Sequence, residues 1–323
     1  MRAKFFATAM LVALALPPAS AVQSAPQAIR GPARCLDTYS ARVCDTASLA
    51  PLRAELAHKF AAVLMAGNRT ATWEARRKAA LREIAQARDY EGKPLSDVEL
   101  AQRFRDQIAD LDKALAQTQS VREMVKTPSA RGETCMATWL DQRCRVTSSG
   151  ILWSKTGQSI YWQMMDGASS EDGVGAGIVL WAGSGFGTAK LIGWSFDGVF
   201  FEPPRLTQDG MIWVPGRVMG TGNGNADLLF EWDEASKSWQ DIELESWRDS
   251  LGSKLPKGFG IWKGVDYDFE GLGAASKLWR ESDANCCPSG GDALLDFAIR
   301  DRKLILTDVR VDIVEKRRAR PKD

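Results

Sequence analysis

Histidine is almost missing from this sequence of 323 residues, because His58 is the only one. A single histidine excludes the sites that need two or more, such as His-rich zinc centres, haem ligand pairs and two-histidine iron sites. His58 follows Leu56 by two residues, which places it about 200° round a helix from the apolar stripe that contains Leu56. We therefore interpret His58 as an exposed helix residue and predict no catalytic histidine.

An excess of charge of one sign is also missing, since 42 Lys and Arg stand against 41 Asp and Glu. Binding of a phosphate backbone depends on a basic face, so near-neutrality argues against a nucleic-acid partner. The only basic run lies in residues 316–323, which we interpret as a solvated basic tail. Beyond residue 21, no segment approaches about 18 consecutive apolar residues, so we expect no membrane span.

The first 21 residues have the pattern of a cleavable export signal. Arg2 and Lys4 give a positive start, an apolar core too short to cross a bilayer follows, and residues 19–21 are small. A buried N-terminal helix is the alternative, but the stretch ends in two prolines and continues into loop-like sequence. We predict a signal peptide over residues 1–21 and a periplasmic or secreted protein.

Six cysteines in an exported protein favour three disulfides. In two pairs eight residues separate the cysteines, and the third pair is adjacent: Cys35 and Cys44, Cys135 and Cys144, Cys286 and Cys287. Local pairing is the preferred interpretation, and it leaves the adjacent pair as a vicinal bridge or as two thiols. In the rival pairing, the adjacent cysteines bond to the second spaced pair. No CxxC spacing is present, so we expect no zinc site.

Residues 48–126 have the period of α-helices. The first apolar stripe repeats at spacings of three and four, which places it on one helix face, and consists of Leu49, Leu52, Leu56, Phe60 and Val63. Two more stripes follow, and the last begins at a capping box made of Ser96 and Glu99. Each helix has one apolar face to bury. We predict a small antiparallel bundle within a helical domain at 22–127, followed by a linker at 128–134.

Residues 135–315 have a different pattern. Short segments rich in β-branched and aromatic residues alternate with Gly, Asn, Asp and Pro turns at intervals of about ten residues. This spacing predicts an all-β antiparallel domain, built as a sandwich, a barrel or a propeller-like sheet. We expect one short helix near 246–255 and a hairpin that turns at 300–303. The fold class is therefore α+β, with two domains.

The helical part carries a resemblance to a known family. Cys44 is followed by Leu49, Leu52, Leu56 and Phe60, with four, two, three and three residues between successive members. This spacing resembles the N-terminal domain family of LprI-type lysozyme inhibitors, which are small exported helical domains. The resemblance covers about residues 35–115, and it implies an exported helical module and a link to lysozyme inhibition.

A later segment of that family also has a counterpart here. Arg88 and Asp89 match its Arg-Asp, and Glu99 precedes a matching apolar series formed by Leu100, Phe104, Ile108 and Leu111. The two cysteines that the family carries in this segment are both absent. The absence of both cysteines together is consistent with the loss of one complete disulfide of the family. The resemblance therefore supports pairing of Cys35 with Cys44. Arg53 stands where the family usually has Asp.

Candidate binding residues lie in the tryptophan-rich half. Ten of the twelve tryptophans lie between Trp153 and Trp279, and aromatic platforms bind sugars, although most sheet tryptophans are core residues. Trp153 also follows Ser149 and Gly150, a pattern faintly similar to the Ser-Gly-x-x-Tyr loop of periplasmic lysozyme inhibitors. Three acids alternate with apolar residues on one predicted strand: Asp266, Asp268 and Glu270. They are further candidates for ligand binding, and a hydrolytic role for them is less favoured.

Cofactor and metal motifs are incomplete. The glycine-rich segment at 183–190 lacks the Gly-Lys-Ser/Thr of a phosphate-binding loop, so we expect no nucleotide cofactor. Asn223, Asn225 and Asp227 have the spacing of the first ligands of a calcium loop. Leu228 stands where that loop needs glycine, which favours a hairpin turn instead. We therefore predict no cofactor, no metal site and no catalytic residue.

Three functions are consistent with these features. The first is an exported envelope protein that acts by binding. It would resemble the lysozyme inhibitors and have lysozyme as its partner. The second is a glycan-binding or peptidoglycan-binding protein that uses the β domain to hold cell-wall glycan. The third and least favoured is an acid-dependent glycoside hydrolase.

Overall fold

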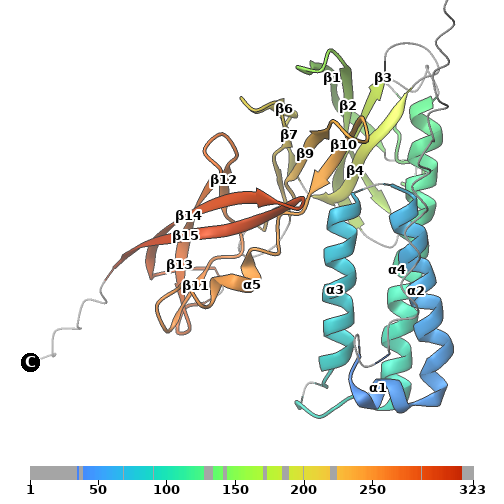
Figure 1. Cartoon of the computed structure of the whole chain (residues 1–323), viewed down its shortest axis with the longest axis vertical. Coiled ribbons are helices and arrows are strands. Elements are labelled where there is room, and N and C mark those ends of the chain that lie inside the picture. The colour runs from blue at the N-terminus through green and yellow to red at the C-terminus, as the bar shows by residue number, and fades with distance from the viewer. Residues whose placement is uncertain are drawn as a thin grey trace, which may run out of the picture.

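The computed structural model describes residues 35, 39–67, 69–89, 91–126, 134–140, 144–169, 173–183, 189–198, 200–218, 224–284 and 286–314. The expected signal peptide, all but the last residue of the linker, and the basic tail lie outside the described residues. The described part confirms the α+β class, with a helical region at 41–126 followed by an antiparallel β domain (Figure 1). Within it, no helix is long and apolar enough to cross a membrane.

The helical region contains three long helices with a short helical entry. Its elements are α1 (Ala41–Asp45), η2 (Ala47–Leu49), α2 (Ala50–Met65), α3 (Thr70–Gln86) and α4 (Asp97–Lys126). Their shared core contains the expected stripe residues, including Leu49, Leu56 and Phe104, which are almost fully buried. The expected capping box is also present, because Ser96 N donates to Glu99 Oε2 at 2.7 Å and Glu99 N donates to Ser96 Oγ at 3.3 Å.

Helix α4 extends beyond the bundle. Its apolar stripe up to Leu111 packs against α2 and α3, whereas Val121 and Val125 pack on the first sheet of the β domain. In the same contact, Trp194 Nε1 donates to the buried hydroxyl of Thr118 at 3.1 Å. One helix therefore contributes to the cores of both regions.

The β domain is a succession of antiparallel meanders. The first sheet has the order β1-β2-β3-β4, the second β10-β9-β7-β6, and the third β11-β13-β14-β15 with β12 beside β13, while β5 pairs with β8. The strands are β1 (Arg145–Trp153), β2 (Ser159–Ser169), β3 (Gly173–Gly183), β4 (Lys190–Gly198), β5 (Phe200–Phe201), β6 (Arg205–Leu206), β7 (Ile212–Val214), β8 (Gly216–Arg217), β9 (Leu228–Asp233), β10 (Ser238–Ile242), β11 (Phe259–Ile261), β12 (Asp266–Asp268), β13 (Gly273–Arg280), β14 (Gly291–Arg300) and β15 (Lys303–Ile313). The expected short helix is α5 (Arg248–Leu251).

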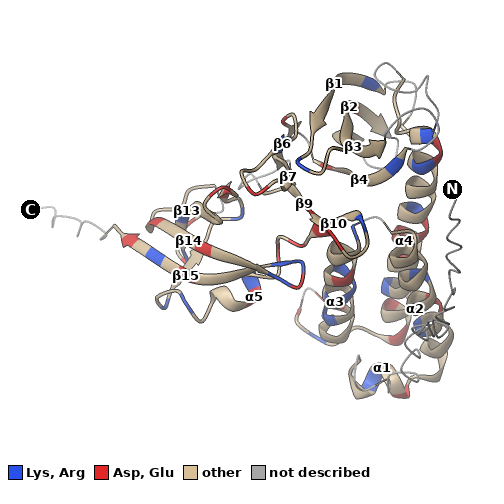
Figure 2. Cartoon of the chain, turned by 45° about the horizontal axis from the view of Figure 1, so that its top comes forward, with Lys and Arg blue, Asp and Glu red and all other residues tan. Residues whose placement is uncertain are grey.

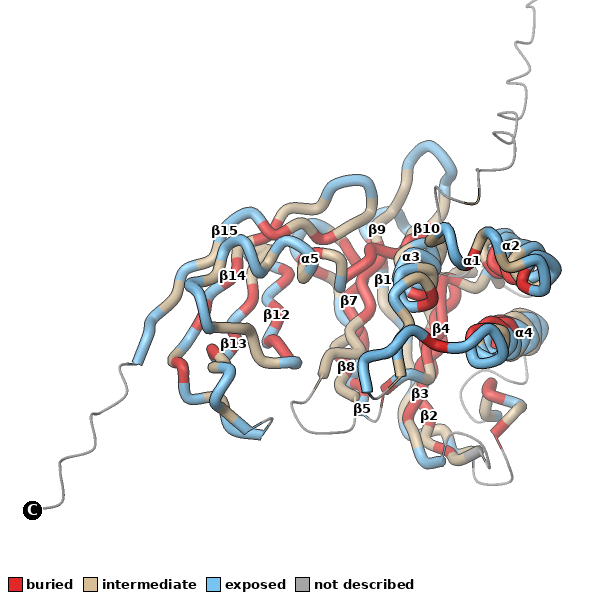
Figure 3. The backbone as a smooth tube through the Cα atoms, turned by 90° about the horizontal axis from the view of Figure 1, so that it is seen from below, coloured by how far each residue is buried: buried red, intermediate tan, exposed pale blue. Residues whose placement is uncertain are grey.

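The sheets pack face to face through two apolar cores. The first core joins sheet one to sheet two and includes Ile178 and Phe230, and the second joins sheet two to sheet three and α5 and includes Trp247 and Leu295. Buried positions accordingly run through the middle of the β domain (Figure 3). Lys, Arg, Asp and Glu are spread over both regions rather than gathered on one face (Figure 2).

The cysteines pair locally. Each bond closes a short segment, and the three disulfides are Cys35–Cys44, Cys135–Cys144 and Cys286–Cys287. The first ties the chain to α1 at the start of the bundle, and the second closes the segment that leads into β1. The adjacent pair lies in the connection from β13 to β14, where both cysteines are exposed.

Candidate functional site

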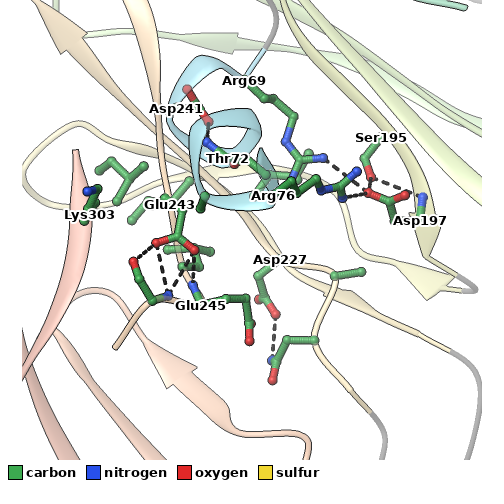
Figure 4. Close-up of a pocket in the computed structure, with 18 of the residues that line it drawn as sticks. Arg69, Thr72, Arg76, Ser195, Asp197, Asp227, Asp241, Glu243, Glu245 and Lys303 are labelled. Carbon is green, nitrogen blue, oxygen red and sulfur yellow. Dashed lines mark hydrogen bonds and ion pairs between the residues drawn. The ribbon is translucent and has the colours of Figure 1, made fainter. Parts of the chain in front are cut away.

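A cleft of about 630 Å³ separates helix α3 from the β domain (Figure 4). One wall is the face of α3 between Arg69 and Arg82, and the other is formed by β4, by residues 225–230 and by β10 with the turn after it. This volume lies within the range of small-molecule pockets. Both walls carry charged side chains, so the cleft favours a polar ligand.

Small side chains on α3 leave this space open. Thr72, Ala75 and Ala79 repeat at spacings of three and four and line the cleft. Lys78 also lines the cleft and makes no hydrogen bond or ion pair with a described residue. The helix wall is thus small in the middle and basic along its borders.

A carboxylate of β10 caps the N-terminus of α3. Arg69 precedes the helix in a left-handed conformation, with φ 51°, and provides no side-chain cap. Asp241, which is 4% exposed, accepts from Ala71 N at 3.0 Å and from Thr72 N at 2.8 Å. A carboxylate at this position satisfies free N–H groups and complements the helix dipole. The β domain therefore fixes where α3 begins.

The turn between β14 and β15 supports the same contact. Asp301 and Arg302 have φ of 50° and 58°, as the central residues of a type I′ hairpin turn do. Arg302 Nη1 donates to Thr70 Oγ1 at 2.7 Å and to Gln240 Oε1 at 3.2 Å. The third sheet is thereby tied to the first residue of α3.

An ion-pair cluster closes one side of the cleft. Asp197 Oδ2 lies 2.6 Å from Arg76 Nη2 and 3.4 Å from Arg69 Nη1, and it accepts from Ser195 Oγ at 3.3 Å. Burial by itself raises the pKa of Asp197, but the two guanidiniums outweigh it and hold the pKa at about 2. Burial, with the neighbouring Arg76 cation, lowers the pKa of Arg69. Asp197 is therefore ionised throughout the physiological range.

A second cavity of about 490 Å³ lies on the other side of this cluster, between α3, α4 and β4. It shares Arg69, Arg76 and Asp197 with the first cleft, so the ion pairs divide the two spaces. Trp73 lines it, and the guanidinium of Arg76 lies 5.0 Å from the centre of the Trp73 ring. The second cavity is therefore the more aromatic of the two.

The far end of the cleft is closed by a weaker contact. Arg82 Nη1 lies 3.1 Å from Asp249 Oδ2, and the two side chains are 58% and 62% exposed. Exposed ion pairs contribute little to stability, because water and salt screen them. This end can therefore open at small cost.

Carboxylates of the β wall face the small residues of α3. Glu243 is buried and accepts from the backbone N–H of Glu245 at 2.7 Å and of Ser246 at 3.0 Å, which orders the turn before α5. Glu245 Oε2 accepts from Arg248 Nε at 2.7 Å, while no described residue donates to Oε1. Desolvation raises the pKa of Glu245, and the Arg248 cation opposes this effect.

Asp227 completes this wall. It accepts from Trp213 Nε1 at 3.0 Å and from Asn225 Nδ2 at 2.8 Å, and Asn225 also accepts from the backbone N–H of Val265 at 2.9 Å. Burial raises the pKa of Asp227 against these hydrogen bonds. Figure 4 shows Asp227, Glu243 and Glu245 gathered on one side of the space, apart from the cluster at Asp197.

The binding candidates from the sequence lie outside the lining of this cleft. Trp153 is 72% exposed at the end of β1, an edge strand of the first sheet. The three acids lie around β12 with separate partners: Asp266 pairs with Arg217, Asp268 Oδ1 accepts from Glu270 N at 3.0 Å, and Glu270 Oε2 accepts from Gln208 N at 2.8 Å. No hydrogen bond among the described residues joins these acids to Trp153, although Gln208 contacts both Glu270 and Lys155, which lies two residues after Trp153.

The remaining candidate residues from the sequence are His58 and the calcium-like series. His58 is exposed on α2. Of the calcium-like spacing, Asn223 lies outside the described residues, while Asn225 and Asp227 hydrogen-bond to each other. Among the described residues, no group of three or more His, Cys, Asp or Glu side chains is placed to hold a metal ion.

Sequence reasoning missed the residues that form the cleft. Asp241 and Glu243 lie on a segment that was expected to be a strand, and Arg76 and Arg82 look like ordinary exposed residues of a helix. One local signal was available, because Thr72, Ala75 and Ala79 give α3 a small-residue face in place of a bulky apolar one. Comparisons with protein-family models, with curated proteins and with solved structures found no match, so the site is interpreted from its own chemistry.

Proposed function

We propose that this chain is an exported envelope protein that acts by binding, and that its ligand occupies the cleft between α3 and the β domain. The observation that carries the proposal is the cleft of about 630 Å³, which is held open between a small-residue helix face and a wall of carboxylates. Fixed contacts at Asp241 and Asp197 preorganise both walls. Preorganisation lowers the entropy lost on binding.

Binding fits the carboxylates better than hydrolysis does. A glycosidase needs two acids that flank the bond to be cleaved, one of them free to donate a proton. Glu245 has a carboxylate oxygen without a described donor, but both oxygens of Asp227 and of Glu243 accept hydrogen bonds from the protein, so neither of these neighbouring acids is free to act with it. The acids around β12 have separate partners. We therefore rank the glycoside hydrolase below a binding protein.

A cleft-blocking variant tests this proposal. Isothermal titration of the exported chain with soluble cell-wall fragments is expected to give saturable binding that Ala79→Trp abolishes, because the indole fills the space beside β10. Ala57→Trp is the matched control, since Ala57 is exposed on α2 and does not line the cleft. Equal binding by both variants would place the ligand elsewhere.

Lysozyme inhibition is the second candidate. It is favoured by the positions that carry the family resemblance, because Leu49, Leu56 and Phe60 form the bundle core beside the Cys35–Cys44 bond. The test is whether the full chain slows lysis of a cell-wall suspension by c-type lysozyme. The full chain is needed because α4 is shared between both regions. Unchanged lysis at saturating protein would remove this candidate.

Export is part of the same proposal. A chain cleaved after Ala21 begins at Val22, which N-terminal sequencing of protein from the periplasm or medium can detect. Recovery of the uncleaved chain from the cytosol alone would contradict it.

A further inference from the structure

The carboxylates in the middle of the β wall of the cleft are not neutralised by the basic residues of α3. Ion pairs cross the cleft at the Asp197 side and at the Arg82–Asp249 end. Between these contacts, no ion pair among the described residues joins α3 to Asp227, Glu243 or Glu245. The carboxylate wall instead faces the small side chains of Thr72, Ala75 and Ala79.

Glu245 is the carboxylate best placed to receive a ligand cation. Its side chain is 56% exposed, and Oε1 has no described donor. A cation placed there would also interact favourably with the nearby Glu243 and Asp227, whose charges act on Glu245. On the helix side, Lys78 offers an ammonium group with no described partner. The cleft thus presents a carboxylate oxygen without a described donor, at Glu245, and two ammonium groups without a described partner, at Lys78 on the helix and at Lys303 on the β wall.

We infer that the cleft binds a short peptide that carries both a free ammonium and a free carboxylate, with the ammonium at Glu245 and the carboxylate at Lys78. The inference rests on the proposed function, because it names the ligand class of the same cleft. A ligand of this kind supplies an ammonium to Glu245 Oε1, which has no described donor, and a carboxylate to the ammonium of Lys78. A neutral sugar oligomer carries no charge that could pair with either group.

The contacts at the two ends of the cleft indicate the length of peptide that fits between them. From Thr72, which is capped by Asp241, to Arg82, which pairs with Asp249, an α-helix rises about 15 Å. An extended peptide spans about 3.3–3.6 Å per residue. The cleft therefore accommodates about four residues between these two contacts.

Calorimetric titration of the full chain with four probes tests the inference. The probes are trialanine, N-acetyl-trialanine, trialanine amide and the neutral trimer of N-acetylglucosamine. We expect trialanine to bind, and we expect blocking either terminus to weaken binding about tenfold, because a charge-assisted contact is lost. Equal affinity for the free and the blocked peptides would overturn the inference.

Paired variants assign each charge. Glu245→Gln should weaken trialanine about tenfold and leave N-acetyl-trialanine unchanged, whereas Lys78→Gln should weaken trialanine and leave the amide unchanged. Glu281→Gln and Lys257→Gln are the controls, because both residues are exposed, lie outside the cleft and have no described partner. A uniform loss for all probes in Glu245→Gln would contradict the assigned contact.

Failure of the inference can be told apart from failure of the proposed function. Binding of the sugar trimer alone, if Ala79→Trp abolishes it, would refute the peptide ligand and keep the cleft as the binding site. Absence of binding by all four probes and by soluble wall fragments would refute both.

Discussion

Helices α3 and α4 both contact the β domain, but one contact is polar and the other is apolar. Helix α4 uses apolar side chains, since Val121 and Val125 are fully buried against the first sheet. Helix α3 uses its polar first turn, which is bound by Asp241 and Arg302. Apolar docking closes the space between the elements, whereas docking through one helix end leaves a cleft beside the rest of the helix.

The two helix contacts therefore differ in role: the α4 contact stabilises the fold, whereas the α3 contact borders the proposed binding site. The α4 contact excludes water and contributes to the folded state through burial of apolar surface. The α3 contact fixes position through a few directed hydrogen bonds and leaves Ala75 and Ala79 facing open space. Substitutions along the two helices should therefore differ in size and in kind.

The largest effect is expected for Val121→Asp on α4. An unpaired carboxylate in this apolar contact should lower the free energy of unfolding by about 4 kcal/mol or more. Val98→Asp is the matched control, because Val98 is on the same helix and is 77% exposed. Chemical denaturation of both variants measures the difference. Similar losses in the free energy of unfolding for the two variants would contradict the apolar docking of α4.

Asp241→Ala should have the next largest effect. It removes the acceptor of two buried N–H groups and the charge at the start of α3, so we expect a loss of about 2 kcal/mol in the free energy of unfolding. Hydrogen exchange should also quicken in the first turn of α3 and not in α4. Unchanged exchange at Ala71 and Thr72 would show that the cap is not needed.

Low pH should lower the free energy of unfolding through Asp197, which pairs with Arg69 and Arg76 beside α3. Its pKa is about 2 in the folded protein against an ordinary 3.8, so the unfolded chain binds more protons in this interval. The stabilisation is complete above the ordinary value and is lost as the pH falls towards about 2. Asp227 and Glu245, whose pKa values are raised, act with the opposite sign above their ordinary values. Denaturation of Asp197→Asn at several pH values should lack the acid-side loss; an unchanged profile would contradict the ion-pair account.

The smallest effect is expected for Arg82→Gln. The Arg82–Asp249 pair is exposed on both sides, so its removal should cost less than about 1 kcal/mol. Thermal unfolding at low and high salt measures it, and high salt should erase the difference. A loss as large as that of Asp241→Ala would mean that both ends of α3 are equally fixed.

Local features of this fold were predictable from the sequence. The Leu49 stripe, the Ser96–Glu99 box and the hairpin at Asp301 depend on neighbours within a few residues, and all three are present. The contact of Asp241 with Ala71 joins residues 170 positions apart, and no periodicity reports such a pairing. The division of α4 was missed for a related reason, because Val121 continues a helical stripe whichever surface it packs against.

Hydrogen exchange along α3 and α4, with and without soluble cell-wall fragments, tests the central claim most directly. Ligand in the cleft should slow exchange in α3 from Ala71 to Arg82 and in the turn at Glu245, and leave the already closed contact of α4 unchanged. Protection confined to β1 around Trp153, or to the bundle entry at Cys44, would contradict the account and place the binding site outside the cleft.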